Sequence, residues 1–296
     1  MAGEWFVTGS MIRAAIMAGA MTIAGAGWGQ TPSADVPPGY TLRWADEFTG
    51  EGLPDPARWR FDTHANRTGW YNNELQYYVA DRLENARVTN GRLVITARAE
   101  TLAAPDHGGQ RYTSARLITQ GRAAWRYGFF EIRAKLPCGA GSWPAIWMLG
   151  EQGEWPDGGE IDIMEHVGND RHVVHSTVHN RATAGTSGDG ASITLPNACD
   201  AFHRYQLHWT RDALDFAVDG RPVHRYARAG KGTAGWPYDA PQYLLLNLAI
   251  GGDMGGRVDD AIFPARFEID YVRVYQKGAA TGPEAATTPS APPHAP

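Results

Sequence analysis

Three acidic residues stand close together in one otherwise apolar segment of the sequence. Glu160, Asp162 and Glu165 lie within residues 159–166, with only Ile or Met between them. Two carboxyl groups about 5–5.5 Å apart can hydrolyse a glycosidic bond with retention of configuration. One attacks the anomeric carbon, and the other protonates the leaving oxygen and later activates water. The segment therefore has the residue types that glycoside hydrolysis needs.

The spacing of these acids predicts a local irregularity. Glu160 and Asp162 are two residues apart and share one face of a strand, whereas Glu165 would point to the opposite face of a regular strand. One extra residue, a β-bulge around Ile163 and Met164, would return Glu165 to the same face. Crowded carboxylates raise at least one pKa, as a general acid requires. Solvated charges on an edge strand are the alternative, which the intervening apolar residues disfavour.

The elements that position these acids read as strands, and helical periodicity is nearly absent. Asn90-Gly91 and Asp219-Gly220 are hairpin turn signals. Apolar and charged residues alternate along 130–136, with Phe130, Ile132, Ala134 and Leu136 separated by Glu131, Arg133 and Lys135. This alternation predicts a strand with one apolar face and one solvent-exposed face. Further strands are expected at 173–179, 205–209, 243–248 and 267–275. Many strands without intervening helices predict an all-β sandwich of two curved antiparallel sheets, whose concave face forms an open substrate cleft.

Composition narrows the class of protein. The chain has 296 residues and a net charge of −5, and its basic residues do not cluster, which argues against a nucleic-acid partner. Eleven Trp residues are present; most are expected in the core and a few in a groove, where they would stack on sugar rings. No segment is a convincing membrane span. We expect a monomer that acts on a polysaccharide and has no membrane partner.

The ends of the chain differ in composition from its centre. Residues 1–26 predict a signal peptide whose true start is Met11, because Arg13, an apolar stretch and Ala24-Gly25-Ala26 follow in that order. Residues 27–39 form a linker, residues 40–276 one catalytic domain, and residues 277–296 a disordered tail rich in Pro and Ala. The protein is therefore expected to be secreted or periplasmic. Cys138 and Cys199 would then form a disulfide, with two buried free thiols as the alternative.

The acidic segment resembles the signature of glycoside hydrolase family 16, in the bulged form typical of laminarinase-like endo-β-1,3-glucanases. Similar stretches occur in the same order through most of the domain, at residues 44–48, 72–78, 112–118, 127–137, 143–149, 202–205, 243–252 and 270–275. The resemblance implies a β-jelly roll. It also implies that Glu160 is the nucleophile, Glu165 the general acid/base and Asp162 an assisting acid.

The resemblance also implies a set of substrate-binding residues. Trp143 and Trp147 match cleft tryptophans that stack on sugars. Arg116 matches a cleft arginine, and because a lone buried guanidinium is costly, it should bond sugar hydroxyls or the nucleophile. Asn72 or Asn73 would bond distal sugars. Asn247, a polar residue within an apolar strand, is expected to face the groove.

The resemblance also implies a role for one histidine near the acids and a structural metal ion. His179 is placed near the acid/base, where it would tune Glu165; a metal pair with His175 is disfavoured because no third ligand has a convincing spacing. No cofactor is expected for catalysis. A structural Ca²⁺ is implied by the resemblance, held by Asp270, the carbonyl of Gly91 and Glu47, whose hard oxygens suit that ion.

The predicted function is therefore endo-acting, retaining hydrolysis of β-1,3-linked glucan. Two alternatives keep the chemistry and change the polymer, to mixed-linkage β-1,3-1,4-glucan or to a galactan. A third is a non-catalytic glucan-binding protein, which the complete acid trio disfavours.

Overall fold

The computed structural model describes residues 33–278. The predicted signal peptide with its start at Met11, residues 27–32 of the predicted linker and nearly all of the predicted tail lie outside the described residues. All strands of the described residues belong to one compact unit, which begins at Asp35. Within it the first strand begins at Tyr40 and the last ends at Lys277.

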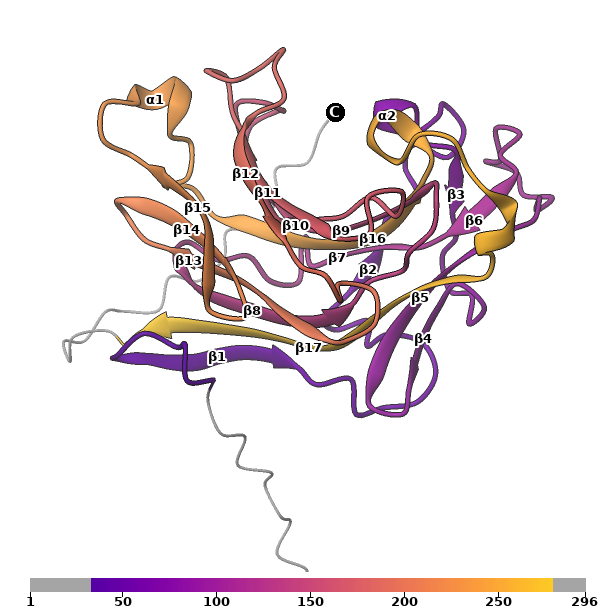
Figure 1. The fold of residues 1–296 in the computed structure, drawn as a ribbon, viewed down its shortest axis with the longest axis horizontal. Coiled ribbons are helices and arrows are strands. Elements are labelled where there is room, and N and C mark those ends of the chain that lie inside the picture. Colours follow the sequence, from indigo (N-terminus) through magenta and orange to yellow (C-terminus); the bar gives the residue numbers. More distant parts are fainter. Residues whose placement is uncertain (1–32, 279–296) are drawn as a thin grey trace, which may run out of the picture. The chain divides into compact units, whose positions relative to one another are not determined.

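Two sheets form the unit, and Figure 1 shows them as stacked layers. The larger sheet has ten strands, which are β1 (Tyr40–Asp46), β3 (Gln76–Tyr78), β4 (Ala86–Thr89), β5 (Arg92–Ala99), β6 (Tyr112–Ser114), β8 (Gly128–Lys135), β13 (His203–Trp209), β14 (Ala213–Val218), β15 (Arg221–Ala227) and β17 (Ala265–Lys277). The smaller sheet has seven, in the order β12 (Asp189–Thr194), β11 (Val173–His179), β10 (Glu160–Glu165), β9 (Ser142–Gly150), β16 (Gln242–Ile250), β7 (Arg116–Ile118) and β2 (Arg60–Phe61). The predicted all-β sandwich is confirmed. Its pairings are antiparallel except that of β3 with β6, which is parallel.

Helices are short and lie in the connections. They are η1 (Tyr71–Asn73), α1 (Gly232–Gly235), α2 (Gly252–Gly255) and η2 (Asp260–Ile262). The two predicted hairpins are present, because β4 and β5 meet at Asn90-Gly91 and β14 and β15 meet at Asp219-Gly220. Asn90 and Asp219 both have φ of 51°, the left-handed conformation that tight hairpin turns require.

The main core lies between the sheets and follows from strand alternation. On β16, Leu244, Leu246 and Leu248 enter the core. Tyr243, Asn247 and Ala249, which alternate with these leucines along β16, face the other side and line a cleft. Strand β9 behaves in the same way, with Ile146 in the core. The smaller sheet therefore presents one face to the core and the other to the cleft.

One residue of β8 differs from the prediction. Glu131 was expected on the solvent-exposed face of the strand, but it is fully buried. Its carboxylate accepts hydrogen bonds of 2.8 Å from Gln206 and from the hydroxyl of Tyr271. Both donors lie on neighbouring strands, β13 and β17, so the burial of Glu131 depends on sheet pairing rather than on its own strand's pattern.

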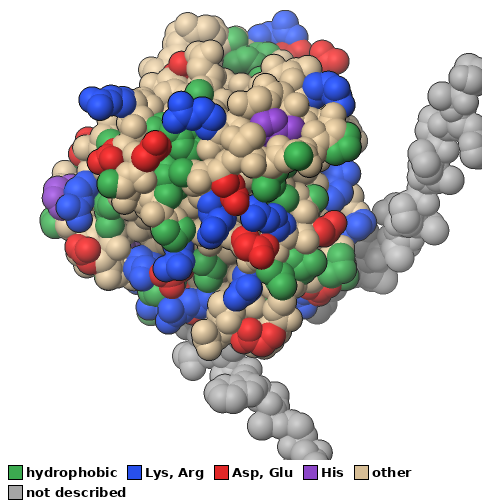
Figure 2. Space-filling model, turned by 90° about the vertical axis from the view of Figure 1, so that its right-hand side faces the viewer, with side chains coloured by type: hydrophobic (Ala, Val, Ile, Leu, Met, Phe, Trp, Pro, Cys, Tyr) green, Lys and Arg blue, Asp and Glu red, His purple; other side chains and the backbone are tan. Residues whose placement is uncertain are grey.

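The structure also bears on the expected absence of a cationic patch, on membrane spans and on the expected disulfide. On the face in Figure 2, Lys and Arg side chains are interspersed with Asp and Glu, so this face offers no continuous cationic patch. No helix among residues 33–278 is long and apolar enough to cross a membrane. Cys138 and Cys199 form a disulfide, with their Cα atoms 5.7 Å apart. Of the two alternatives for these cysteines, the structure has the bridge.

Candidate active site

Strand β10 carries the predicted β-bulge. Its pairing with β9 shifts register between Asp162 and Met164, and its pairing with β11 shifts between Asp162 and Glu165. Ile163 and Met164 are consecutive, yet both belong to the core cluster. A regular strand cannot direct two successive side chains to one face, so the bulge is confirmed. As a result, Glu160, Asp162 and Glu165 all line the same cleft.

Steric constraints explain why the residue directly before the acidic segment, Gly159, is a glycine. Gly159 has φ of +74°, and a Cβ atom at this position would lie 2.6 Å from the ring of Pro237. An L side chain would be strained by the backbone and would also collide with that ring. Glycine therefore allows the chain to enter β10 beside the loop that holds Pro237.

The cleft is a hollow of about 750 Å³ on the outer face of the smaller sheet, within the range of about 300–1,000 Å³ typical of ligand sites. A second hollow shares its acids and extends past β11 and β12. Besides the acids, the first is lined by Arg60, Asp62, His64, Tyr71, Asn72, Glu74, Arg116, Gln120, Trp143, Ala145, Trp147, Leu149, Trp155, Tyr243, Asn247 and Ala249. Aromatic rings and polar groups on one wall suit a sugar polymer.

Two tryptophans donate hydrogen bonds to the two glutamates. The indole Nε1 of Trp155 donates to Oε2 of Glu160 at 2.6 Å. Trp143 Nε1 donates to Oε1 of Glu165 at 3.1 Å. Trp143 was expected to stack on sugar, but only 6% of it is exposed. Its ring therefore offers little face to a ligand, and its visible contribution is to hold Glu165.

The acids have raised pKa values. Burial raises the pKa of Glu160 to about 8, and the nearby charge of Asp162 adds to this. Burial raises the pKa of Glu165 to about 7, with the charge of Glu160 as the next cause. Burial also raises the pKa of Asp162 well above its ordinary value, and the charge of Glu165 adds to it. The cluster therefore keeps a proton at neutral pH, as a general acid needs.

His179 acts on Glu165 as expected but does not contact it. Its charge lowers the pKa of Glu165, whereas its Nε2 lies 3.4 Å from Oδ2 of Asp162 and its register partner on β10 is Glu160. His175 is the residue opposite Glu165. The physical reason is the antiparallel register, which pairs the C-terminal end of β11 with the N-terminal end of β10.

Arg116 is buried in the cleft wall and paired with an acid that the sequence analysis did not single out. Its Nε lies 3.0 Å from Oδ2 of Asp62, with side-chain exposures of 7% and 12%. Its guanidinium also lies over the rings of Trp70 and Trp147, at 5.1 and 4.8 Å from their centroids. Of the two expected partners of Arg116, the nucleophile is not bonded, since the ion-pair partner is Asp62, although the charge of Arg116 lowers the pKa of Glu160. A bond to sugar hydroxyls stays a prediction.

Asn247 faces the cleft, as expected, and holds Trp147. Its Oδ1 accepts a 2.7 Å hydrogen bond from Nε1 of Trp147, and its Nδ2 donates to the hydroxyl of Tyr78 at 3.0 Å. Tyr78 in turn lies 3.5 Å from Oε2 of Glu74. This chain of hydrogen bonds fixes the orientation of the Trp147 ring across the cleft floor.

The two asparagines of η1 differ in position. Both have φ of 56°. Asn72 lines both hollows, whereas the side chain of Asn73 donates to Oδ1 of Asp253 at 2.7 Å. Of the two candidates, Asn72 is the one placed to meet a ligand.

The two carboxylates expected to hold calcium, those of Asp270 and Glu47, are paired with arginines. Asp270 lies on β17 close to the turn at Gly91, since Leu93 pairs with Ile269. Oδ2 of Asp270 is 2.5 Å from Arg133, and both carboxylate oxygens of Glu47 accept from Arg273. Carboxylates already neutralised by arginine do not favour a cation, so the residues do not fit the ion as they stand. Calcium binding stays a prediction.

Besides Asp62, the cleft residues that the sequence analysis did not single out include Trp155 and Glu74. Trp155 lies in a loop without strand or helix periodicity, so no pattern indicated where it points; it is 58% exposed. Glu74 lies within a stretch noted for its resemblance, but no role was assigned to it. Its Oε2 accepts a 2.8 Å hydrogen bond from Gln76, and burial raises its pKa. The pair Trp155-Pro156 directly before the acidic segment was the available signal.

A family model, a curated relative and two solved structures all relate this chain to glycosyl hydrolases that act on β-glucan. The model of the family described as glycosyl hydrolases family 16 matches residues 73–273. The beta-glucanase of Rhodothermus marinus is 47% identical over 256 residues, covering 82% of this chain and 87% of that protein. The solved structure of SCLam, a non-specific endo-β-1,3(4)-glucanase, has 52% identity and a TM-score of 0.79, covering 82% of this chain and 93% of its own. The laminarinase structure from Rhodothermus marinus has 47% identity and a TM-score of 0.75, covering 80% and 97%.

Proposed function

The chain belongs to glycosyl hydrolase family 16, and on that premise we propose that it is a secreted, monomeric endo-hydrolase of β-1,3-linked glucan that retains anomeric configuration. Glu160 is the nucleophile, Glu165 the general acid/base and Asp162 the assisting acid. The observation that carries this proposal is the β-bulge of β10, which brings both glutamates into one cleft. The similar proteins include a beta-glucanase and a laminarinase, and their activities support the choice of polymer.

In the first step, a carboxylate oxygen of Glu160 attacks the anomeric carbon, and the bond from that carbon to the glycosidic oxygen breaks. Glu165 gives its proton to the departing oxygen, so the leaving chain departs as an alcohol. In the second step, ionised Glu165 takes a proton from water, whose oxygen attacks the same carbon and releases Glu160. Two inversions give net retention.

The proton for the first step comes from the buried acid cluster. Glu165, with a pKa raised to about 7, is largely protonated below neutral pH. Glu160 has a higher pKa in the free cleft because of its burial and the charge of Asp162, so it must lose its proton before it attacks. The charge of His179 and the hydrogen bond from Trp155 favour its ionised form. The two roles are assigned from the family motif, not from the order of these pKa values.

The remaining cleft residues supply binding. Trp155, which is 58% exposed and hydrogen-bonds Glu160, gives a face on which a sugar can stack. Trp147 on β9, held by Asn247, gives a second ring in the same cleft. Two rings in one open cleft would bind more than one sugar of a polymer, which suits cleavage within a chain.

Digestion of laminarin with analysis of product length tests the proposal. Early release of a range of oligosaccharides is expected from the wild type, and Glu160→Gln should lower the rate by several orders of magnitude while its thermal unfolding stays cooperative. Glu154→Gln is the matched control, because Glu154 is exposed in the preceding loop and does not line the cleft. Full activity of Glu160→Gln would overturn the assignment. Binding of laminarin without any turnover by the wild type would favour a glucan-binding protein.

A second candidate substrate has a specific observation in its favour. SCLam, which is 52% identical to this chain, is described as a non-specific endo-β-1,3(4)-glucanase. Mixed-linkage β-1,3-1,4-glucan is therefore the first alternative polymer. Comparison of kcat/KM on laminarin and on barley β-glucan decides between them, and a higher value on the latter would reverse the preference.

Secretion is proposed from residues 1–26 alone, by their composition. N-terminal sequencing of the protein recovered outside the cytoplasm should give a sequence that begins after Ala26. Recovery of the intact N-terminus from the cytoplasm would contradict this part of the proposal.

A further inference from the structure

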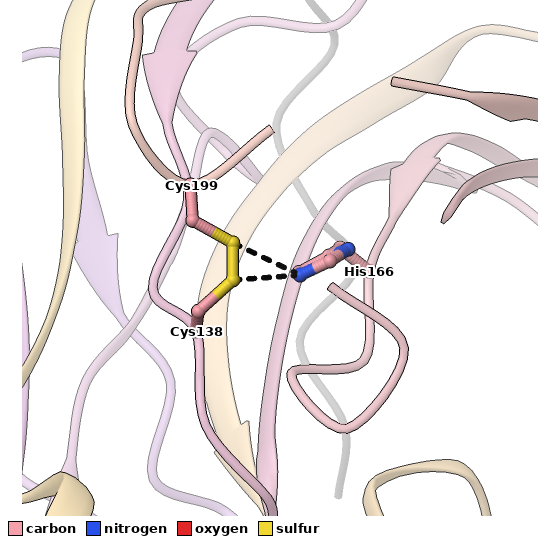
Figure 3. Close-up of side chains that lie close together, drawn as sticks. All are labelled: Cys138, His166 and Cys199. Atoms are coloured by element: carbon pink, nitrogen blue, oxygen red, sulfur yellow. Dashed lines mark hydrogen bonds between the residues drawn. A yellow bond between two sulfur atoms is a disulfide. The ribbon is translucent and has the colours of Figure 1, made fainter. Parts of the chain in front are cut away.

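A cluster of three metal-ligating side chains lies outside the cleft. Cys138 follows β8, Cys199 precedes β13, and His166 directly follows β10, so the cluster joins three segments that are distant in sequence. Figure 3 shows the imidazole of His166 pointing at both sulfur atoms of the disulfide. Its Nε2 lies 3.7 Å from the sulfur of Cys138 and 3.8 Å from that of Cys199. Neither hollow of the active site is lined by any of the three.

The hydrogen bonding of His166 fixes which ring nitrogen carries the proton. Its Nδ1 lies 2.8 Å from the carbonyl oxygen of Val173. A carbonyl can only accept, so Nδ1 is the donor, and in the neutral ring Nε2 presents its lone pair. The sulfur atoms of a disulfide have no hydrogen to give. His166 is fully buried, so the lone pair of Nε2 faces two sulfurs without a donor.

The same arrangement is the one that metal-binding histidines use. A ligating imidazole generally donates its other N–H to a backbone carbonyl or carboxylate, which orients the ring toward the metal. The Val173 carbonyl does this for His166. Two thiolates and one imidazole are soft to intermediate ligands, which select Zn²⁺ or Cu⁺ and not Ca²⁺ or Mg²⁺.

The distances also agree with a tetrahedral ion. Bonds of about 2.3 Å to sulfur and about 2.0–2.1 Å to nitrogen at tetrahedral angles separate sulfur and nitrogen by about 3.6 Å. The observed separations of 3.7 and 3.8 Å are close to this value. His166 could therefore stay in place, and only the two sulfurs would have to move apart. Two thiolates would also cancel the charge of a divalent ion, which lowers the cost of burying it.

We propose that Cys138, Cys199 and His166 have a second, reduced state in which they bind one thiophilic metal ion, of which Zn²⁺ is the type. A dithiol reductant supplies two electrons and two protons to the bridge and is itself oxidised to a disulfide. The two thiols formed then lose their protons as the ion binds, and water occupies the fourth position. The ion replaces the covalent link between the segments that follow β8 and precede β13.

Cobalt binding to the reduced full-length chain tests this proposal. Co²⁺ replaces Zn²⁺ in such sites and absorbs visibly when tetrahedral, with an additional near-ultraviolet band when thiolates are ligands. One equivalent of Co²⁺ is expected to bind the reduced protein with both features and to be displaced by Zn²⁺. The oxidised protein should bind none at the same concentration. Laminarin hydrolysis and thermal unfolding, measured on the reduced sample, report that it is folded.

Variants identify the ligands. His166→Asn keeps a donor for the Val173 carbonyl but lacks Nε2. It should weaken Co²⁺ binding by more than about 100-fold, since the loss of outer partners alone costs about 10–100-fold. Cys199→Ser should remove the near-ultraviolet band or reduce it by half. His172→Asn is the control, because His172 is exposed nearby and lies outside the cluster; it should bind Co²⁺ as the wild type does.

Four results would overturn the proposal. The first is a folded, reduced protein that takes up no Co²⁺. The second is uptake without thiolate absorption, and the third is uptake that His166→Asn leaves unchanged. The fourth is unfolding of the chain on reduction even with Co²⁺ or Zn²⁺ present, because the ion would then fail to replace the bridge.

Discussion

The indole Nε1 of Trp155 donates a 2.6 Å hydrogen bond to Oε2 of Glu160. This bond joins a ring that is 58% exposed to a carboxylate of the buried acid cluster. Trp155 can therefore contribute to the reaction in two ways that can be tested separately. The ring offers a face to sugar, and the N–H favours the ionised form of the proposed nucleophile.

Trp155→Phe should keep the first contribution and lose the second. A hydrogen bond to a charged group is worth about 1.5–3 kcal/mol, so kcat/KM on laminarin should fall by about 10–100-fold. Trp155→Ala should lose more, through a higher KM. Steady-state kinetics of both variants separate the two effects. Wild-type kinetics for Trp155→Phe would show that the hydrogen bond has no part in catalysis.

The activity should depend on a proton held near neutral pH. The reaction needs Glu160 ionised and Glu165 protonated at the same time, but their pKa values are raised to about 8 and about 7, so only a minor fraction of the free enzyme has this state. The ratio kcat/KM, which reports the free enzyme, should therefore be bell-shaped, with its maximum between about pH 7 and pH 8. The charge of Glu74 contributes to the raised pKa of Glu165. Glu74→Gln should therefore move the acid limb of the profile to lower pH and lower the maximum, while Glu154→Gln leaves both in place. An acid limb that moves upward in Glu74→Gln, or no alkaline limb in the wild type, would refute this account of the two acids.

Stability should fall with pH through the same groups. Folding raises the pKa of Glu160 to about 8 from its ordinary value of 4.5, so the folded state binds more protons than the unfolded state between these pH values. The free energy of unfolding therefore decreases as pH rises through this window. Glu160→Gln should decrease less between pH 5 and pH 8, by urea denaturation at each pH. An equal decrease in variant and wild type would mean that Glu160 ionises normally.

The ion pair of Arg116 and Asp62 should be costly to break from one side. Both side chains are nearly buried, and removal of one partner of a buried pair costs about 3–5 kcal/mol. Asp62→Asn is expected to destabilise the protein by this order in chemical denaturation. Asp215→Asn is the control, since its partner Arg225 is 62% exposed and exposed pairs are worth about 1 kcal/mol or less. Equal effects of the two variants would show that Arg116 does not need Asp62.

The bulge in β10 was predictable because its residue types conflict with a regular strand. Acids at positions 160, 162 and 165, with apolar residues between them, can share a face only if one residue is added. The two hairpins were predictable for a similar local reason, since Asn-Gly and Asp-Gly favour positive φ. The bulge and the hairpins depend on residues that are adjacent in the sequence, so they can be predicted from the sequence alone.

Features that depend on partners from other strands were not predictable in this way. Glu131 follows the alternation of β8 and was expected in water, but Gln206 and Tyr271 satisfy it in the interior. The direct contact of His179 with Asp162 rather than Glu165 depends on the register between β10 and β11, which the sequence does not display. Trp155 reaches Glu160 from an irregular loop, and no periodicity reports the direction of such a side chain.

The stereochemistry of the first product tests the central claim most directly. Proton NMR of laminarin digestion, recorded before mutarotation is complete, distinguishes the anomers of the new reducing end. A nucleophilic Glu160 with Glu165 as acid/base predicts that the β-anomer appears first, and that the α-anomer follows only as mutarotation proceeds. Early appearance of the α-anomer would mean single-step inversion and would contradict the proposed roles of Glu160 and Glu165.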